Sequence, residues 1–384
     1  MPAAKSRALL ALTASALALP GLSQFARADS PPAQSTASLR VSTYEEDELD
    51  SSVRLAGSTE RYDIDIQQLR LQMPVGDSYA LTLNSSHESM SGASPWYTIR
   101  RADGSTGVIM SGATISEDRR DFSANVRRYL TNGAIGFTLG GSNEDDYESR
   151  SGGIDAERHF NDNLTTLAAG LSYSSDELEP TQQIGFIRIT SAEKRSRSAF
   201  FSVSQILNRD TVLQSGISLT TLTGYLSDPY KLNDKRPDER TQVAWTTALR
   251  RYFAGPDAAL QADYRFYHDD YGINSHTLDL TWYQNLGNWQ IVPGIRYYAQ
   301  SAADFFRQAL VFGPNPPIQS TDFRLSSYGA WSGSVKVQWE LDAFTISASA
   351  ERYFASASYG IYEGLESPAL VDFTRLSLGA DYRF

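Results

Sequence analysis

Apolar and polar residues alternate along positions 375–384, up to the last residue of the chain. The apolar set lies on one face and is Leu376, Leu378, Ala380, Tyr382 and Phe384. Successive side chains of a β-strand point to opposite faces, so the segment is predicted to be a strand with one apolar and one charged side. Chain ends fray unless they are paired, and we therefore expect this strand to belong to a sheet.

The same alternation recurs from about Ser38 onward, in segments of roughly ten residues. Tight polar turns link pairs of segments at 74–78, 131–133, 161–163, 208–210, 254–257, 287–288 and around Asp342. These turns are rich in Asn, Asp, Gly and Pro, as tight hairpins require. The other connections, most of them longer, lie near 49–59, 91–116, 145–150, 175–195, 224–238, 270–272, 302–325 and 356–370. Together they predict about sixteen strands.

Short turns at one end, longer loops at the other and an even strand count are typical of transmembrane β-barrels. A soluble sandwich also alternates, but it does not need an apolar face on nearly every strand with no helix between. The predicted fold class is therefore all-β, a transmembrane antiparallel barrel of about sixteen strands, with no substantial helix apart from a signal peptide. The closing strand resembles that of bacterial outer-membrane barrels, whose terminal aromatic residue is read by the assembly machinery. Phe384 is the candidate assembly signal.

The N-terminus has the order of a secretory signal peptide. Lys5 and Arg7 precede an apolar run at 8–19, and Ala26-Arg27-Ala28 offers a small-residue cleavage site. We expect residues 1–28 to be the signal peptide, 29–37 a periplasmic lead and 38–384 the outer-membrane barrel. The final strand would then close the sheet against residues 39–45, with both chain ends in the periplasm.

Removing the signal peptide changes the net charge from −11 to −14, which argues against a nucleic-acid partner. Because the chain has no cysteine, disulfides and thiolate metal sites are excluded. One strand changes phase, since Ile64 and Ile66 fall on one face and Leu69 and Leu71 on the other. A β-bulge near Gln67-Gln68 would restore its register.

Charges of both signs occupy the face of the strands opposite the apolar one. The candidate lumen residues are Arg127, Arg250, Arg265, Asp263, Arg296, Asp279, Lys336, Glu340, Arg375 and Asp381. A barrel of this size is wide enough to hold water, so these charges could set the ion preference of a pore. Alternatively, they pair across strands and hold the wall together.

Acidic clusters recur at the ends of strands, for example at 45–48, 144–148 and 176–179. None has the spacing of a dedicated calcium loop, and we expect solvated charge with loose divalent bridging at the cell surface; no metal or cofactor is assigned. His268, beside Asp269 and Asp270, is the best acid–base candidate, but no nucleophile pattern accompanies it. We expect no enzymatic activity. His268 and His276 flank a short connection and could meet as neighbours.

Several runs in the loops carry a resemblance to a known family. They are Ser91–Pro95, Thr223–Lys231, Arg236-Pro237, Tyr264–Ile273, Ser275–Leu278 and Pro293–Phe306. Together they resemble the exported bacterial proteins of the domain-of-unknown-function family three-five-seven-zero. That resemblance implies an outer-membrane barrel associated with small lipoproteins, thioredoxin-like proteins and a flavin-transferring enzyme of the envelope. The loop motif candidates are Gly224, Tyr225, Asp228, Pro229, Tyr230, Lys231, His268, Asp269, Asp270, His276, Gln300, Asp304, Phe305 and Phe306.

The function expected from these features is a porin-like channel or conduit with a charged lumen. The alternative is a non-conducting scaffold that binds an envelope partner, with a redox or flavin-linked role, or surface divalent cations. The apolar loop 302–317 could enter the lumen, cover it or dock a partner. The expected surroundings are outer-membrane lipid and lipopolysaccharide, the barrel assembly machinery and a periplasmic lipoprotein or redox partner.

Overall fold

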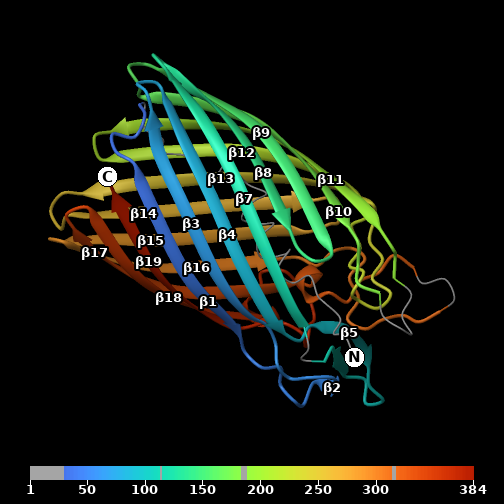
Figure 1. The fold of residues 1–384 in the computed structure, drawn as a ribbon. Coiled ribbons are helices and arrows are strands. Elements are labelled where there is room, and N and C mark those ends of the chain that lie inside the picture. Colours follow the sequence, from blue (N-terminus) through green and yellow to red (C-terminus); the bar gives the residue numbers. More distant parts are fainter. Residues whose placement is uncertain (1–29, 113–114, 183–187, 314–316) are drawn as a thin grey trace.

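A computed structural model describes residues 30–112, 115–182, 188–313 and 317–384; the expected signal peptide lies outside these ranges. Sixteen antiparallel strands close into a barrel, each beside its neighbours along the chain, so the predicted fold class is confirmed (Figure 1). The barrel strands are β1 (Thr36–Glu46), β3 (Asp63–Val75), β4 (Tyr79–Gly92), β7 (Ile115–Leu130), β8 (Gly133–Asn143), β9 (Tyr147–Phe160), β10 (Thr165–Leu178), β11 (Ala192–Asn208), β12 (Thr211–Gly224), β13 (Glu239–Phe253), β14 (Ala258–Asp269), β15 (Asn274–Leu286), β16 (Trp289–Gln300), β17 (Tyr328–Leu341), β18 (Phe344–Ser356) and β19 (Phe373–Arg383).

The tight turns lie together at one end of the barrel and the longer connections at the other, which we call the turn end and the loop end. Each of the tight turns predicted from the sequence joins two consecutive barrel strands, from β3–β4 to β17–β18. Several turn residues have the left-handed backbone conformation that Asn, Asp and Gly tolerate, including Asn161, Asp342 and Gly287. Local turn chemistry therefore fixes where the chain reverses.

The last strand closes the barrel against the first, as expected. β19 pairs with β1 from Thr36 opposite Arg383 to Glu46 opposite Phe373. Beyond the ladder, the amide N–H of Phe384 donates to the carbonyl of Ser35 at 3.0 Å. β1 begins at Thr36, two positions earlier than the expected start of the barrel at Ser38.

The outer face of the wall is apolar and exposed, which is the surface that a bilayer would cover. Leu378 is 66% exposed and Leu171 64%, and each alternates with more polar neighbours. Aromatic pairs lie near both ends of this face: Trp289 stacks on Trp339 at the turn end, and Tyr297 packs against Trp331 nearer the loop end. No helix among the described residues is long and apolar enough to cross a membrane.

The expected bulge in β3 is wrong. The register of β3 runs without a shift through Gln67 and Gln68 against both of its neighbours. Ile64 instead faces the interior, where it packs in a buried cluster with Tyr44, Tyr62 and Met90. The change of phase in the sequence therefore marks an apolar lining inside the loop end of the barrel, not an inserted residue.

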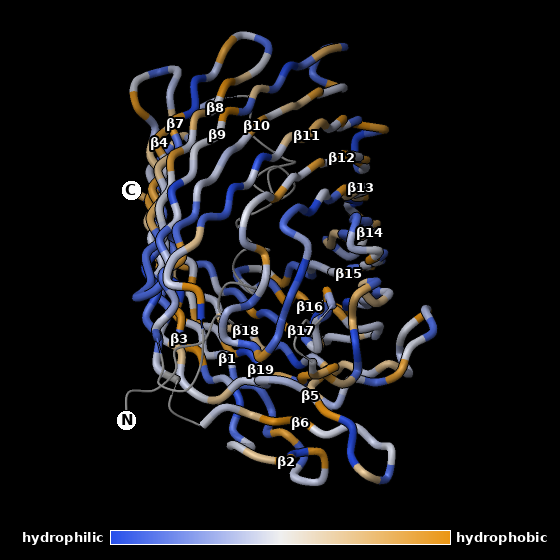
Figure 2. Tube along the Cα trace, turned by 90° about the vertical axis from the view of Figure 1, so that its right-hand side faces the viewer, coloured by the Kyte–Doolittle hydropathy of each residue, from blue (hydrophilic) through white to orange (hydrophobic). Residues whose placement is uncertain are grey.

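The loop end carries folded structure that the strand pattern does not predict. A small sheet forms from β2 (Arg54–Ala56), β5 (Pro95–Arg100) and β6 (Thr106–Met110), and both views place it beyond the ends of the barrel strands (Figure 1, Figure 2). Two single-turn 3₁₀-helices, η1 (Phe323–Leu325) and η2 (Ala357–Tyr359), lie in later connections. We call the connections 93–112, 225–238 and 301–327, as far as they are described, the loop cap.

Candidate functional site

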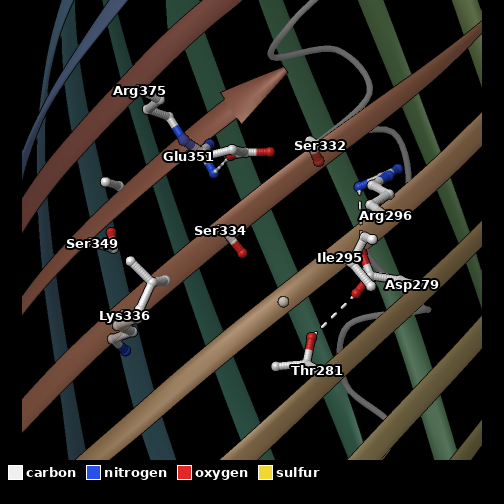
Figure 3. Close-up of a pocket in the computed structure, with 13 residues that line it drawn as sticks. Asp279, Thr281, Ile295, Arg296, Ser332, Ser334, Lys336, Ser349, Glu351 and Arg375 are labelled. Atoms are coloured by element: carbon white, nitrogen blue, oxygen red, sulfur yellow. Dashed lines mark hydrogen bonds and ion pairs between the residues drawn. The ribbon is translucent and has the colours of Figure 1, made fainter. Parts of the chain in front are cut away.

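A polar pocket of about 260 Å³ lies on the inner wall of the barrel, between β15 and β19. Its charged lining comes from five strands, and Figure 3 shows these side chains spread over neighbouring strands of one stretch of wall. The charged residues are Asp279, Arg296, Lys336, Glu351 and Arg375. Four lumen candidates of the sequence, Asp279, Arg296, Lys336 and Arg375, thus line one pocket, and the structure adds Glu351 to them.

Two cross-strand ion pairs lie in this pocket. Arg375 contacts Glu351 at 2.6 Å and Arg296 contacts Asp279 at 4.0 Å, and both pairs occupy directly opposed positions of neighbouring strands. Lys336 differs, because it forms no ion pair with any carboxylate of the described chain. The serines Ser332, Ser334 and Ser349 supply further hydrogen-bonding groups to the lining. The pocket can therefore offer one uncommitted cation and several hydroxyls to a small polar solute.

The remaining lumen candidates are mostly paired within the wall. Arg127 contacts Asp155 at 2.6 Å and Glu157 at 2.7 Å. Arg250 forms a two-bond pair with Asp263, and Arg383 lies 3.5 Å from Glu340. Arg265 lies over the ring of Tyr267, and Asp381 forms no ion pair with a described residue. Cross-strand pairing thus accounts for much of the lumen charge outside the pocket.

The first loop motif folds into the loop cap. At Gly224 the backbone φ is +106° and a Cβ would clash with the carbonyl of Glu193, so only glycine fits there. The amide of Tyr225 then donates to that same carbonyl. Asp228 accepts from the amide of Tyr230 at 3.0 Å, with Pro229 between them. Lys231 donates to the carbonyl of Pro95 at 2.7 Å, which joins two loops of the cap.

A buried ion cluster holds the loop cap together. Asp322 is 1% exposed and accepts hydrogen bonds from Arg236 and Arg324. Arg236 also donates to Asp234 at 2.8 Å. Burial alone would raise the pKa of Asp322, but Arg324, Lys231 and Arg236 more than offset that effect and hold the pKa well below its usual range.

The second loop motif serves as a turn anchor. Asp269 is 1% exposed and accepts from the side chains of Arg240 and Tyr267 and from the amides of Tyr271 and Ile273. Asp270 accepts from the amide of Thr241 at 2.9 Å. The carboxylates of Asp269 and Asp270 therefore serve to close the β14–β15 connection. Burial raises the pKa of Tyr271 to about 12, although Arg240 and Arg236 oppose it.

The histidines have separate partners. His268 lies 2.9 Å from the Asn274 side chain, and His276 contacts the hydroxyls of Tyr264 and Tyr362 at 2.7 and 2.9 Å. No contact joins the two imidazoles among the interactions of the described residues. The structure therefore does not assemble them into a pair.

The third loop motif, Gln300 with Asp304, Phe305 and Phe306, makes contacts that support the loop cap. Gln300 is 4% exposed and donates to the carbonyls of Arg324 and Ser326. Phe305 and Phe306 pack in a buried cluster with Tyr271, and the amide of Asp304 donates to the carbonyl of Tyr271. The apolar loop 302–317, as far as it is described, thus folds on itself and on its neighbours.

One cluster of buried acidic side chains is not apparent from the sequence. Glu117 on β7 lies beside Glu144 and Asp146 of the β8–β9 connection, and all three are buried. The expectation of solvated charge at 144–148 is wrong for Glu144 and Asp146, which are 5% and 2% exposed. No local pattern links this run to Glu117, because their contact depends on how β7 and β8 are paired.

The comparisons with known proteins agree with this fold. The chain is similar to CdiB from Acinetobacter baumannii, with a TM-score of 0.53 and 10% identity over 91% of this chain and 60% of that one. It also matches the siderophore receptor PirA from Pseudomonas aeruginosa (TM-score 0.46, 12% identity, 91% of this chain and 62% of that one). A BenF-like porin from Pseudomonas fluorescens Pf-5 matches with a TM-score of 0.45 and 11% identity, over 91% of this chain and 98% of that one.

The chain spans less than two thirds of the first two of these structures. At 10% identity the likeness to CdiB, whose TM-score is above 0.5, shows the fold alone, that of a β-barrel. No curated protein matches the sequence. The family model described as "Protein of unknown function (DUF3570)" matches residues 9–367, and the chain therefore belongs to that family.

Proposed function

We propose that this chain is exported to the outer membrane and acts there as a porin-like channel or conduit for small charged or polar solutes. The observation that carries the proposal is the inner-wall pocket, in which Arg296 pairs with Asp279, Arg375 pairs with Glu351, and Lys336 lines the wall without an ion pair to a described carboxylate. A wall that only had to hold the barrel together would pair every charge, whereas Lys336 remains available. Mixed charges and hydroxyls suit a solute that must bind briefly and leave again.

The loop cap supports a conduit with a restricted entrance. Its connections are joined by Lys231 to Pro95, by Lys235 to Gln319 and by the amide of Leu310 to Thr98. Such a fixed arrangement over one end favours a narrow or gated opening over a wide, freely diffusing pore.

Conductance across planar bilayers tests the proposal. Purified full-length protein, with folding verified by heat-modifiable gel migration, is expected to give discrete conductance steps. A form lacking residues 302–325 is expected to give larger steps, because it lacks part of the cap. Silent bilayers from both folded forms would overturn the channel.

A non-conducting scaffold is the second candidate, and one feature favours it. Large apolar side chains are exposed on loops beyond the barrel strands, with Phe312 at 59%, Ile361 at 59% and Leu365 at 72%. These loops touch, since the Gln308 side chain donates to the carbonyl of Glu366. An envelope partner, with a redox or flavin-linked role, could bury such residues. In that case Phe312→Ser and Leu365→Ser would abolish partner binding while bilayers stay silent.

The proposal includes no catalytic step and no nucleic-acid partner. His268, the best acid–base candidate of the sequence, contacts Asn274, and its neighbour Asp269 is engaged with Arg240. Lipid and lipopolysaccharide would contact the outer face, and Phe384 would be read by the assembly machinery. These assignments rest on the fold class and on the terminal strand.

A further inference from the structure

Three arginines lie on the outer face of the barrel at its turn end. Arg128 on β7, Arg158 on β9 and Arg251 on β13 each stand two positions before the last residue of their strand. All three are exposed. Because side chains alternate along a strand, they share the outer face with the exposed apolar residues Val126, Ile154 and Trp245.

Each of these arginines lies over an aromatic ring of the outer face. Cζ of Arg128 is 5.8 Å from the ring centroid of Tyr79, which stands directly opposite it on β4. Cζ of Arg158 is 5.5 Å from the ring of Phe160, and Cζ of Arg251 is 5.2 Å from the ring of Phe253. The N–H donors of a guanidinium lie in its own plane, so a ring against its face leaves them able to bond an acceptor.

The wall supplies no anion to these three arginines. Within the described ranges, no ion pair or side-chain hydrogen bond joins any of them to another residue. None of their neighbours in the strand ladders is acidic: they are Tyr79 and Ile135 for Arg128, Gly133 and Leu167 for Arg158, and Thr211 and Leu260 for Arg251.

The same outer face does carry arginine–acid pairs near the loop end. Three such pairs are Arg150 with Glu148 at 2.7 Å, Arg195 with Glu193 at 2.8 Å and Arg352 with Asp47 at 2.7 Å. These arginines alternate in phase with the exposed residues Ile154, Phe201 and Phe354, which places them on the outer face. The sequence can therefore pair an outer arginine with an acid of its own, and at the turn end it does not.

The surroundings specify an anion that comes from the membrane. The exposed apolar band is the surface that acyl chains would cover, and the three arginines lie at its edge. Long arginine side chains reach from such an edge to the headgroups, and a guanidinium binds phosphate through two parallel N–H···O bonds. We propose that Arg128, Arg158 and Arg251 bind the phosphate groups of acidic phospholipids in the leaflet at the turn end, which is the periplasmic side in outer-membrane barrels.

Arg128 and Arg158 are placed to hold one headgroup between them. They flank β8, whose Ile135 stands opposite Arg128 and whose Gly133 stands opposite Arg158. Strands two places apart are separated by about 10 Å, which two arginine side chains can span around one phosphate. Gly133 has no side chain to fill the space between them. Arg251, four strands further round the barrel, would bind a separate lipid, and neither site depends on whether the barrel conducts.

Native mass spectrometry of the full chain tests the proposal. The protein, folded in non-ionic detergent, is mixed with phosphatidylglycerol or with phosphatidylcholine of the same acyl chains. We expect tighter binding of phosphatidylglycerol, because each arginine near an acidic headgroup contributes about fivefold in affinity. The triple variant Arg128→Gln, Arg158→Gln, Arg251→Gln should weaken phosphatidylglycerol binding at least tenfold and leave phosphatidylcholine binding unchanged. Arg158→Gln alone, with a loss of about fivefold, keeps the test if the triple variant does not fold.

The matched control removes three arginines that have acidic partners on the same face. Arg150→Gln, Arg195→Gln and Arg352→Gln together make the same charge change and should leave phosphatidylglycerol binding unchanged. Only variants that retain heat-modifiable migration are compared. Equal binding of the two lipids by the wild type, or an equal loss in both triple variants, would overturn the proposal. Displacement of the lipid by an excess of inorganic phosphate, at constant ionic strength, would show a site for free phosphate and overturn it as well.

Discussion

Arg127 on β7 forms an ion pair with Asp155 on β9 at 2.6 Å, although β8 lies between the two strands. The contact exists because Gly136 of β8 stands opposite both residues in the ladders. A Cβ at this position would clash with the carboxylate of Asp155. Because Gly136 has no side chain, the side chain of Arg127 can reach across β8 to Asp155. This one buried cation thus joins β7, β8 and β9.

We predict that Gly136→Ala separates this pair and destabilises the barrel. The added methyl group displaces the carboxylate of Asp155, and overpacking of this kind costs about 1–3 kcal/mol. Arg127 then keeps Glu157 as its carboxylate partner and loses the link to Asp155 across β8. Urea unfolding in lipid vesicles, followed by tryptophan fluorescence, measures the change. Gly333→Ala is the control, because a Cβ at Gly333 meets no atom within 4 Å. Equal stability of the two variants would contradict the role of Gly136.

The loop cap is predicted to depend on one carboxylate. Asp322→Asn removes the negative partner of Arg236 and Arg324, and breaking a buried ion pair costs about 3–5 kcal/mol. We expect faster proteolysis within 301–327 and, if the barrel conducts, larger conductance steps. Asp103→Asn makes the same charge change in an exposed turn and should alter neither. A cap that resists protease in Asp322→Asn would show that the ion cluster does not hold it.

Low pH should open the loop cap, and the direction of this pH dependence follows from the pKa of Asp322. That pKa is depressed in the folded protein, so the carboxylate stabilises the cap above its unfolded pKa near 3.9, and this stabilisation is lost as pH falls through the lower folded value. We expect the cap to stay closed at about pH 4 and to open only well below it. Pepsin, which is active in this range, reports opening by cleavage within the cap. Cleavage that starts above pH 5 would contradict the depressed pKa.

Lys336 is predicted to set ion preference without contributing to stability. It lines the inner-wall pocket and has no ion-pair partner among the described carboxylates. Lys336→Gln should therefore shift the selectivity of the channel toward cations, while the free energy of unfolding changes by less than about 0.5 kcal/mol. Reversal potentials under a salt gradient measure the shift. Lys235→Gln, in the exposed cap, is the charge-matched control; an equal shift in both variants would remove Lys336 from the conduction path.

The wall of the barrel was predictable because its signals are local. Alternation with a period of two and turn residues such as Asn161 and Gly287 are set within a few positions of the chain. The error at Gln67-Gln68 has a physical cause, since the alternation assumes a polar interior. Near the loop end the interior is instead lined by Ile64 and Tyr44, and an inward apolar residue then resembles a slip in register.

The site residues were less predictable because they depend on contacts between distant segments. Asp322 meets Arg236 only when two long connections fold over the same end of the barrel. Glu117 meets Asp146 only through the pairing of β7 with β8 and the turn that follows. Composition and spacing carry no record of such contacts, whereas they do record the strands and turns.

Phe384 is predicted to matter for assembly more than for stability. Its side chain is 57% exposed and, among the described rings, stacks only on Tyr382, while its backbone bonds to Ser35 do not involve the ring. Phe384→Ala should therefore leave refolding in detergent almost unchanged and lower the amount of folded protein in cells. The ratio of heat-modifiable to unfolded protein in outer-membrane fractions measures the cellular effect.

Phe344→Ala is the matched control for this variant, because Phe344 also stacks on Tyr382, is 49% exposed and lies within the chain. If the terminal aromatic is read as a signal, only Phe384→Ala lowers folded protein in cells. If both variants lower it equally, the loss reflects the aromatic stack at the turn end. If neither does, closure of β19 against β1 suffices for assembly, and the ring of Phe384 is not the signal.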